Sequence, residues 1–551
     1  MVNDPIIITD LVVRMIDGQC SPLTRRDRWR IVDYELEQIG PGRALTNGNW
    51  DAGPLTLRLG VEGHYRISLV SRYSLIRAKL TSDRCWSDCE PIRQGHKLLG
   101  NDQIYREGYY DAEEIVWREA ELTGNDLVLD ERMPIALMAI RLTPIEPKQD
   151  TAKVRWPMMF TNDGGNFGER LHRGPDDMFE WCERVPTDGC ARVMVIGSIA
   201  GDNCAFPTRV GTELGAYTQR GEYWDEHYNQ IARNLAQYRK WDIHPAKAIV
   251  EYAHERGWEA HYYIRMRGFC DAAPIIGTRS SRFFTEHPQW RMVGPGGEPV
   301  QGLSFAYPQV QEHMCNLFAE LKGHGVDGVT PCFVRGSPPV LYEPIMVDGF
   351  KQKYGDDPRT LDESDPRWLD YQGNVFNTFM RRAKDTLGTD CRLSPMIHGL
   401  PALNRRFALD VATWVDQGIV DDLFIMGHRY DRQDGHFGGG PEHLDFEYFH
   451  NLPGRQNVRL WTMFYGYGTG GIYEYDWPTY WNAFHRWLDM GADGYGLWDI
   501  AAMPTDSRAN IWDLGKTPRP QYQKPQRLIG KYELKMWDGY LWNRYTPIEA
   551  W

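Results

Sequence analysis

Three carboxylic acids in the sequence occupy positions suited to acid–base chemistry: Glu343, Asp499 and Asp431. Glu343 follows a loop stiffened by the pair Pro338–Pro339, and Asp499 directly follows Trp498. Two carboxyl groups about 5–10 Å apart can cleave a glycosidic bond, because one protonates the leaving oxygen while the other acts as nucleophile or general base. We therefore predict Glu343 and Asp499 as the catalytic pair, with Asp431 as a further general acid or base. The alternative for each is a structural carboxylate that pairs with an arginine or with backbone N–H groups.

Polar and aromatic side chains near these acids are suited to holding a substrate. Arg265 and Arg335 could bind an anionic sugar, such as a uronate or a sulfate, through bidentate contacts, or else only balance nearby carboxylates. His398 and His428 suit hydroxyl groups, and the indole of Trp498 suits the apolar face of a sugar ring. The predicted substrate-binding set is Arg335, Tyr342, Arg265, Asp163, Asp202, His398, His428, Tyr430 and Trp498.

The sequence predicts neither a metal site nor a cofactor. His436 and His443 flank the glycines 438–440 without the HxxxH or HxH spacing of a metal site, and no Lys-Ser/Thr follows those glycines to form a phosphate-binding loop. The 10 cysteines are scattered, and the neighbouring Cys85 and Cys89 lack CxxC spacing. We expect reduced thiols and a cytoplasmic protein. A disulfide between Cys85 and Cys89, and an exported form whose leader has been removed, stay open.

The composition favours a carbohydrate partner over nucleic acid or membrane. The formal net charge is -13, and the longest basic run, 25–30, is mixed and predicts a solvated turn or helix face, so nucleic acid is not an expected partner. No apolar stretch of about 18 residues is present, so no membrane span is expected. The 21 Trp, 29 Tyr and 20 Phe supply flat rings that stack on sugars, or else a Trp-rich core. The sequence does not predict the oligomeric state.

The first 147 residues have the pattern of a small antiparallel β-sandwich. Short alternating runs at 54–59, 64–70, 75–80 and 135–142 are separated by turns rich in Gly, Ser and Asp. The segment 144–150 predicts a linker, because its prolines cannot continue a sheet. A chain of 551 residues exceeds what one hydrophobic core usually supports. We therefore predict an accessory sandwich domain at 1–147 and a catalytic domain at 148–551.

After residue 148, short apolar runs alternate with longer stretches of helical period, which indicates a parallel α/β fold. Roughly eight such units over about 350 residues predict a (β/α)8 TIM barrel with insertions. A doubly wound sheet is the main alternative, but the turn at 162–166 does not match the GxGxxG that it would need. The predicted strands are 154–160, 192–198, 259–266, 329–334, 392–397, 422–426, 458–464 and 494–498, and the predicted helices are 228–239, 245–256, 309–322, 368–386, 407–417 and 480–490.

The predicted strands explain why the candidate residues should meet. In a TIM barrel the active site lies at the C-terminal ends of the strands, in the loops that follow them. Each residue of the predicted site stands at the end of a predicted strand or shortly after it. Glycine-rich loops at 435–440 and 466–471 follow two of the later strands and suit lids over a substrate.

Several segments of the chain together resemble a known family. The segments that carry the resemblance are 327–344, Asp357-Pro358-Arg359, 365–369, 418–422 and 120–124, and the family is the bacterial "family 10 glycosylhydrolase-like" barrel proteins. The resemblance implies a glycoside hydrolase-like barrel after an N-terminal sandwich, and it is weak for the substrate. Many relatives carry Asp residues on the fourth strand in a DGIxLD-like stretch, where this chain has Thr330, Pro331 and Cys332. The catalytic acid and nucleophile of those relatives therefore cannot be assigned to residues of this chain from the resemblance alone.

Three functions compete at this stage. The leading hypothesis is a glycoside hydrolase that uses Glu343 and Asp499 on a poly- or oligosaccharide, with an anionic glycan as one possibility. The missing fourth-strand Asp residues motivate a second, a non-catalytic carbohydrate-binding protein. The third is a lyase acting on uronates, for which Tyr342, His398 and Arg335 supply a base and a group that neutralises the carboxylate.

Overall fold

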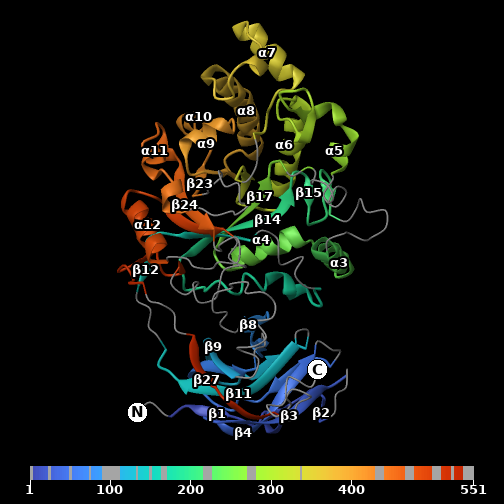
Figure 1. Cartoon of the computed structure of the whole chain (residues 1–551), viewed down its shortest axis with the longest axis vertical. Helices are drawn as coiled ribbons and strands as arrows, with labels where there is room; N and C mark the ends of the chain where they lie inside the picture. The colour runs from blue at the N-terminus through green and yellow to red at the C-terminus, as the bar shows by residue number, and fades with distance from the viewer. Residues whose placement is uncertain are drawn as a thin grey trace, which may run out of the picture.

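The computed structural model of the chain describes most of its residues. These are residues 4–22, 27–48, 52–72, 76–89, 112–131, 134–147, 152–162, 171–214, 226–267, 269, 281–334, 338–427, 440–465, 477–498, 511–522 and 527–537. Figure 1 shows a β-rich unit at one end of the molecule and a barrel surrounded by helices above it.

The β-rich unit consists of two sheets that share one core, as the predicted sandwich requires. Buried side chains of both sheets form this core, among them Leu57 and Leu129 from one sheet and Ile67 and Leu137 from the other. The strands of sheet A are β1 (Ile6–Ile8), β2 (Cys20–Ser21), β3 (Trp29–Leu36), β4 (Gly40–Gly48), β6 (His64–Ser71), β9 (Ala112–Glu121), β11 (Pro134–Pro144), β27 (Leu528–Tyr532) and β28 (Leu534–Trp537). The strands of sheet B are β5 (Leu55–Leu57), β7 (Ile76–Leu80), β8 (Ser87–Cys89) and β10 (Leu127–Leu129).

The end of the chain returns to this N-terminal unit. Strand β27 pairs antiparallel with β9, and β28 pairs antiparallel with β3. In Figure 1 the red β27 lies among the blue and cyan strands of sheet A. The assignment of everything after residue 147 to the barrel therefore does not hold for residues 528–537. The basic run at 25–30 needs a correction as well, because Trp29 is fully buried and begins strand β3.

The barrel is closed. Among the described residues, eight parallel strands follow one another around it, and β13 pairs with both β14 and β25 to complete the ring. This finding excludes the doubly wound open sheet and confirms the predicted fold class. The eight strands are β13 (Met158–Asn162), β14 (Ala191–Ala200), β17 (Glu259–Arg265), β20 (Gly328–Cys332), β22 (Met396–His398), β23 (Asp422–Met426), β24 (Arg459–Tyr465) and β25 (Gly494–Trp498).

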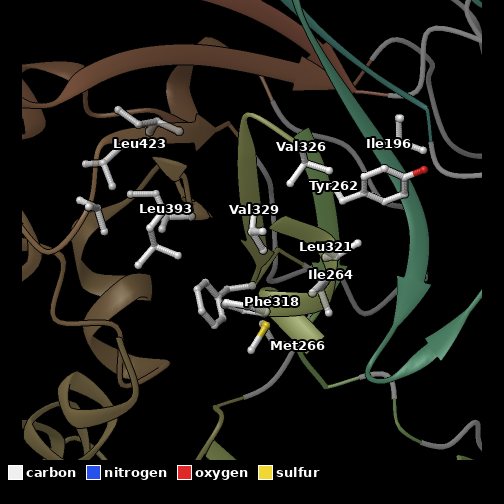
Figure 2. Close-up of a cluster of buried hydrophobic side chains, with 14 of the residues drawn as sticks. Ile196, Tyr262, Ile264, Met266, Phe318, Leu321, Val326, Val329, Leu393 and Leu423 are labelled. Carbon is white, nitrogen blue, oxygen red and sulfur yellow. The ribbon is translucent and has the colours of Figure 1, made fainter. Parts of the chain in front are cut away.

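Helices pack on the outside of the barrel through the outward-facing side chains of its strands. Figure 2 shows Phe318 and Leu321 of α6 beside Val329 of β20 and Ile264 of β17. Because successive strand residues face opposite sides, these apolar side chains alternate with those that point into the barrel. The helices are α3 (Glu226–Lys240), α4 (Pro245–Glu255), α5 (Arg282–Glu286), α6 (Pro308–Gly323), α7 (Pro344–Tyr354), α8 (Pro366–Leu387), α9 (Pro401–Arg406), α10 (Val411–Asp416), α11 (Phe446–His450) and α12 (Trp477–Asp489). None of the helices in the described part of the chain has the length and apolar character needed to span a bilayer.

Local sequence signals set the helix ends. The carboxylate of Asp365 accepts a hydrogen bond from the backbone N–H of Arg367, and Pro366 occupies the first helical position, so α8 begins there. Gly388, with φ 66°, follows its last residue. The predicted helix 407–417 is only partly correct, since α9 ends at Arg406 and α10 begins at Val411 after its N-cap, Asp410.

The interior of the barrel is apolar in the middle and ionic at the N-terminal end of the strands. Arg459, the first residue of β24, donates two hydrogen bonds to Glu259 at 2.9 and 2.8 Å and two to Asp422 at 2.5 and 3.2 Å. Asp422 also accepts hydrogen bonds from the Trp461 indole and the Ser394 hydroxyl. The apolar layers above this network consist of Met159, Val193, Val195, Tyr263, Cys332, Val334, Met396, Phe424, Met426, Trp461, Met463 and Trp498.

A buried arginine links the two units. Arg77 of β7 is fully buried and pairs with Asp130 at 2.5 Å and with Asp88 at 3.3 Å, both in the β-rich unit. It also pairs with Glu180, which follows the first barrel strand. Buried charges are tolerated only when they are paired, so this group of three acids around one arginine fixes the contact between the units.

We predict that Arg77→Ala destabilises the protein by about 3–5 kcal/mol, because three acids would lose their buried cation. Urea unfolding measures the effect. Arg66→Ala is the matched control, since Arg66 pairs with Glu119 on the exposed surface of sheet A, and it should cost at most about 1 kcal/mol. Equal losses in the two variants would contradict the linking role of Arg77.

Candidate functional site

The C-terminal ends of the barrel strands form one open end of the barrel, the mouth. The sequence predicted that the substrate site lies there. In β17 the alternation of the strand turns His261, Tyr263 and Arg265 toward the same side. Tyr263 belongs to the interior layers, so Arg265 is the inward-facing side chain at the end of this strand. Trp498, the last residue of β25, belongs to the same interior group.

Tyr263, Arg265 and Trp498 form one cluster, the mouth cluster. The rings of Tyr263 and Trp498 are 5.0 Å apart between centroids. The guanidinium carbon of Arg265 lies 5.8 Å from the Tyr263 centroid and 5.7 Å from the Trp498 centroid. A guanidinium above aromatic faces is attracted by their electron density. The structure therefore brings two of the predicted substrate-binding residues, Arg265 and Trp498, together.

Trp498 does not offer an open platform for a sugar ring. Its side chain is only 1% exposed, and Arg265 lies near its ring. The indole therefore belongs to the floor of the mouth, and Arg265, which is half-buried, is the member of the cluster that solvent reaches.

Tyr263 is a residue that the sequence reasoning missed. Its hydroxyl is buried and has no hydrogen-bond partner among the described residues. A Cβ at Gly197 would lie 1.9 Å from the Tyr263 ring, so only glycine at 197 lets the ring cross the barrel. The available signal was the period of two in the strand, which places Tyr263 on the same side as Arg265.

His398 ends β22 and is completely buried. The side-chain amide of Asn404 hydrogen-bonds to both the N–H and the carbonyl of His398, at 3.0 and 2.8 Å, which fixes the backbone at the strand end. The imidazole centroid lies 4.8 Å from that of Phe407. His398 therefore connects the barrel mouth with the first helices after β22.

Glu343 lies in the loop between β20 and α7, and its side chain is fully buried. The carboxylate accepts hydrogen bonds from the backbone N–H groups of Leu341 at 2.9 Å and Val293 at 3.3 Å, and the Ser304 hydroxyl also hydrogen-bonds to it. Burial raises the pKa of Glu343, and these hydrogen bonds oppose the rise. In this arrangement the carboxyl group holds the loop and is covered from solvent.

Asp202 follows the end of β14 and is also buried. Its carboxylate is 2.8 Å from Nε2 of His313 on α6, and the His313 ring stacks on Phe283 at 3.7 Å between centroids. Asp202 is thus engaged by an outer helix of the barrel, although the sequence predicted that it binds substrate.

A cavity of about 880 Å³, the side pocket, opens among the loops that follow β20, β22 and β23. Tyr342 lines it, with its ring stacked on Trp368 at 5.1 Å between centroids. The described lining residues are Pro295, Pro338, Leu341, Tyr342, Glu363, Trp368, Leu369, Gln372, Leu400, Leu403, Arg406, Phe407, Glu442 and His443. The predicted contact residue Tyr342 therefore lies in a cavity, while its neighbour Glu343 does not line it.

The remaining predicted site residues lie outside the described residues. They are Asp163, Arg335, His428, Tyr430, Asp431 and Asp499. The glycine-rich segments 435–439 and 466–471 lie outside them too. The proposed pairing of Glu343 with Asp499 therefore stays a prediction.

Within the described ranges, no group of three or more His, Cys, Asp and Glu side chains is arranged to hold a metal ion. All the described cysteines are free thiols, including Cys85 and Cys89, so these two do not form the disulfide that the sequence left open.

The arrangement can bind a polar ligand at the mouth and hold an apolar group beside it. Arg265 supplies five N–H donors in a planar fork, and Tyr263 supplies a buried hydroxyl. The described residues thus provide binding groups, and the predicted acids that would carry out bond cleavage are Asp499, Asp431 and Glu343.

No protein-family model and no curated protein matches the chain. Similar solved structures include the catalytic domain of β-amylase from Paenibacillus polymyxa, with 11% identity, 63% of this chain and 93% of that chain covered, and a TM-score of 0.38. The glycoside hydrolase domain of PgaB (BpsB) from Bordetella bronchiseptica has 12% identity, 65% and 99% coverage and a TM-score of 0.38. The α-galactosidase TtGalA from Thermus thermophilus has 11% identity, 90% and 97% coverage and a TM-score of 0.38. TM-scores of 0.38 are too low to establish the fold, which rests on the strand order of the barrel itself. The resemblance to the family 10 glycosylhydrolase-like proteins stays a prediction.

The raised pKa of Glu343 predicts a pH-dependent stability. The folded protein binds this proton more tightly than the unfolded chain does, so the contribution of Glu343 to stability is complete below the ordinary pKa of 4.5 and is lost as the pH rises through the folded pKa. The free energy of unfolding of the wild type, relative to Glu343→Gln, should therefore fall over a pH series that rises from 4.5.

Urea unfolding of both proteins over this pH series checks the prediction. Glu312→Gln, on the exposed surface of α6, controls for the loss of a carboxylate elsewhere on the protein. A difference between wild type and Glu343→Gln that stays constant with pH would show that burial does not raise the pKa of Glu343.

Proposed function

We propose that this protein is a glycoside hydrolase that cleaves a poly- or oligosaccharide at the C-terminal mouth of its barrel. The observation that carries the proposal is the mouth cluster, in which a half-buried Arg265 lies near the rings of Tyr263 and Trp498 inside a closed barrel. TIM-barrel enzymes place their chemistry at this face. A cation above an aromatic floor, with a hydroxyl beside it, suits the mixed polar and apolar faces of a sugar.

Asp499 and Glu343 are the proposed catalytic carboxyl groups. Asp499 directly follows Trp498, the last residue of β25, in the sequence. Burial raises the pKa of Glu343, which is the direction of shift that favours a general acid. To reach a substrate, however, the Glu343 carboxyl would have to release the N–H groups of Leu341 and Val293. Asp431 is the proposed acid if Glu343 only holds its loop.

A screen of the full chain against neutral, acidic and sulfated glycans, with products identified by mass, tests the activity. Hydrolysis adds one water to the products for each bond cleaved, whereas lyase products lack that water. No product from any glycan would contradict the hydrolase proposal and leave a carbohydrate-binding protein.

On a glycan that is cleaved, we predict that Asp499→Asn lowers kcat by about 10²–10⁴-fold, because a positioned acid or base contributes that much. Glu343→Gln should cause a similar loss if Glu343 is the acid. Asp385→Asn and Glu312→Gln, on exposed faces of α8 and α6, are matched controls and should keep the wild-type kcat. Full activity of both Asp499→Asn and Glu343→Gln would show that the proposed pair is wrong.

The charge of the glycan is tested by Arg265→Gln. If the substrate is anionic, loss of the guanidinium should raise KM for an acidic glycan by at least about tenfold, since a charge-assisted bidentate pair is lost. KM for a neutral analogue should change much less. Equal changes for acidic and neutral glycans would remove the anionic substrate from the proposal.

A further inference from the structure

The side pocket is mainly apolar. Four of its leucines, Leu341, Leu369, Leu400 and Leu403, are only half-buried, so their side chains still expose surface in the cavity. Pro338 is half-buried and Pro295 is exposed in the same lining. A cavity of about 880 Å³ with such walls favours an apolar ligand, because filling it removes hydrocarbon surface from water.

The charged groups of the side pocket form two pairs, and the side chain of Gln372 donates a hydrogen bond to the carbonyl of Val340 at 3.2 Å. Arg406 lies 3.8 Å from Glu363, and Nδ1 of His443 lies 3.0 Å from Glu442. Arg406, Glu363 and Glu442 are exposed, so the charged groups lie at the edge of the cavity and the leucines form much of its walls.

The aromatic rings of the side pocket do not present an open face on which a sugar ring could stack. Trp368 is 1% exposed because Tyr342 stacks on it, and Phe407 is 5% exposed. Sugar rings need an open aromatic face and several fixed hydrogen-bonding groups. The leucines offer neither, so the walls suit an alkyl or aromatic group better than a further sugar unit.

The side pocket adjoins the barrel mouth. Its lining comes from the connections that lead from β17 to β20, from β20 to β22, from β22 to β23 and from β23 to β24. Phe407 lines the pocket and also contacts His398, the last residue of β22. The contact between Phe407 and His398 therefore joins one wall of the side pocket to the C-terminal end of β22.

We propose that the side pocket binds the apolar aglycone, an alkyl or aromatic group, of a glycoside whose sugar lies at the barrel mouth. This inference rests on the proposed glycoside hydrolase function and specifies its substrate as an amphipathic glycoside. Each methylene that enters the cavity should tighten binding about threefold to fourfold until the cavity is full, which is the effect of burying one CH₂ group.

Binding of n-alkanols to the full chain tests the apolar site without requiring turnover. Isothermal titration with n-butanol, n-hexanol and n-octanol should show affinity rising with chain length. Leu403→Asp puts a carboxylate in the wall and should weaken n-octanol binding by at least about tenfold. Leu400→Trp fills the cavity without adding a charge and should also weaken it. Leu171→Asp, at an exposed leucine outside the pocket, is the control and should bind n-octanol like the wild type.

Two results would overturn the inference. One is an affinity that does not rise from n-butanol to n-octanol, and the other is n-octanol binding that Leu403→Asp and Leu400→Trp leave unchanged. If the glycan screen shows hydrolysis and either result appears, the aglycone site fails and the hydrolase stands. If n-octanol binds in the pocket and no glycan is hydrolysed, the apolar site stands and both the hydrolase and the aglycone assignment fail.

Discussion

Closure of the eight-stranded sheet is the constraint on which the rest of this structure depends. Strand β13 pairs in parallel with β14 on one side and β25 on the other, so all eight strands run in one direction around one axis. Parallel closure brings the C-terminal ends of distant segments to one face. Arg265 and Trp498 are more than two hundred residues apart in sequence, and they meet because of this closure. On the neighbouring strands β14 and β17, the Tyr263 ring occupies the space that a side chain at Gly197 would need.

The two ends of the barrel use charge in different ways. At the N-terminal end, Arg459 is bound by Glu259 and Asp422. Burial alone would raise the pKa of Glu259, but its hydrogen bonds with His261 and Arg459 hold it well below the usual value. The charges of this network are paired with one another, which suits a structural role. At the C-terminal end, Tyr263 has a buried hydroxyl without a partner among the described residues, and Arg265 is half-buried. The C-terminal end, with this half-buried cation, is the face at which we propose that substrate binds.

Much of the barrel could be predicted because its strands are short apolar runs with clear ends. The predicted strands 422–426 and 494–498 coincide with β23 and β25. Errors occurred where proline interrupts a ladder. Pro395 has no N–H group to donate, and the predicted strand 392–397 is divided there into β21 (Arg392–Leu393) and β22. The first strand begins at Met158, after Pro157, because residues 153–154 pair instead with residues 516–517.

The sequence by itself determined the order of the elements, the barrel class and the strand ends at which Arg265, His398 and Trp498 stand, because these follow from local hydrophobic period and turn residues. The sequence could not show which of the candidate side chains are buried or hydrogen-bonded by other parts of the chain. Glu343 is held by N–H groups of Val293 and Leu341, Asp202 by His313, and Tyr342 lines a cavity with Trp368. It also gave no sign that residues 528–537 return to the first sheet. Only the tertiary structure decided these points, because burial and hydrogen bonding depend on residues far apart in the chain, and no local pattern records them.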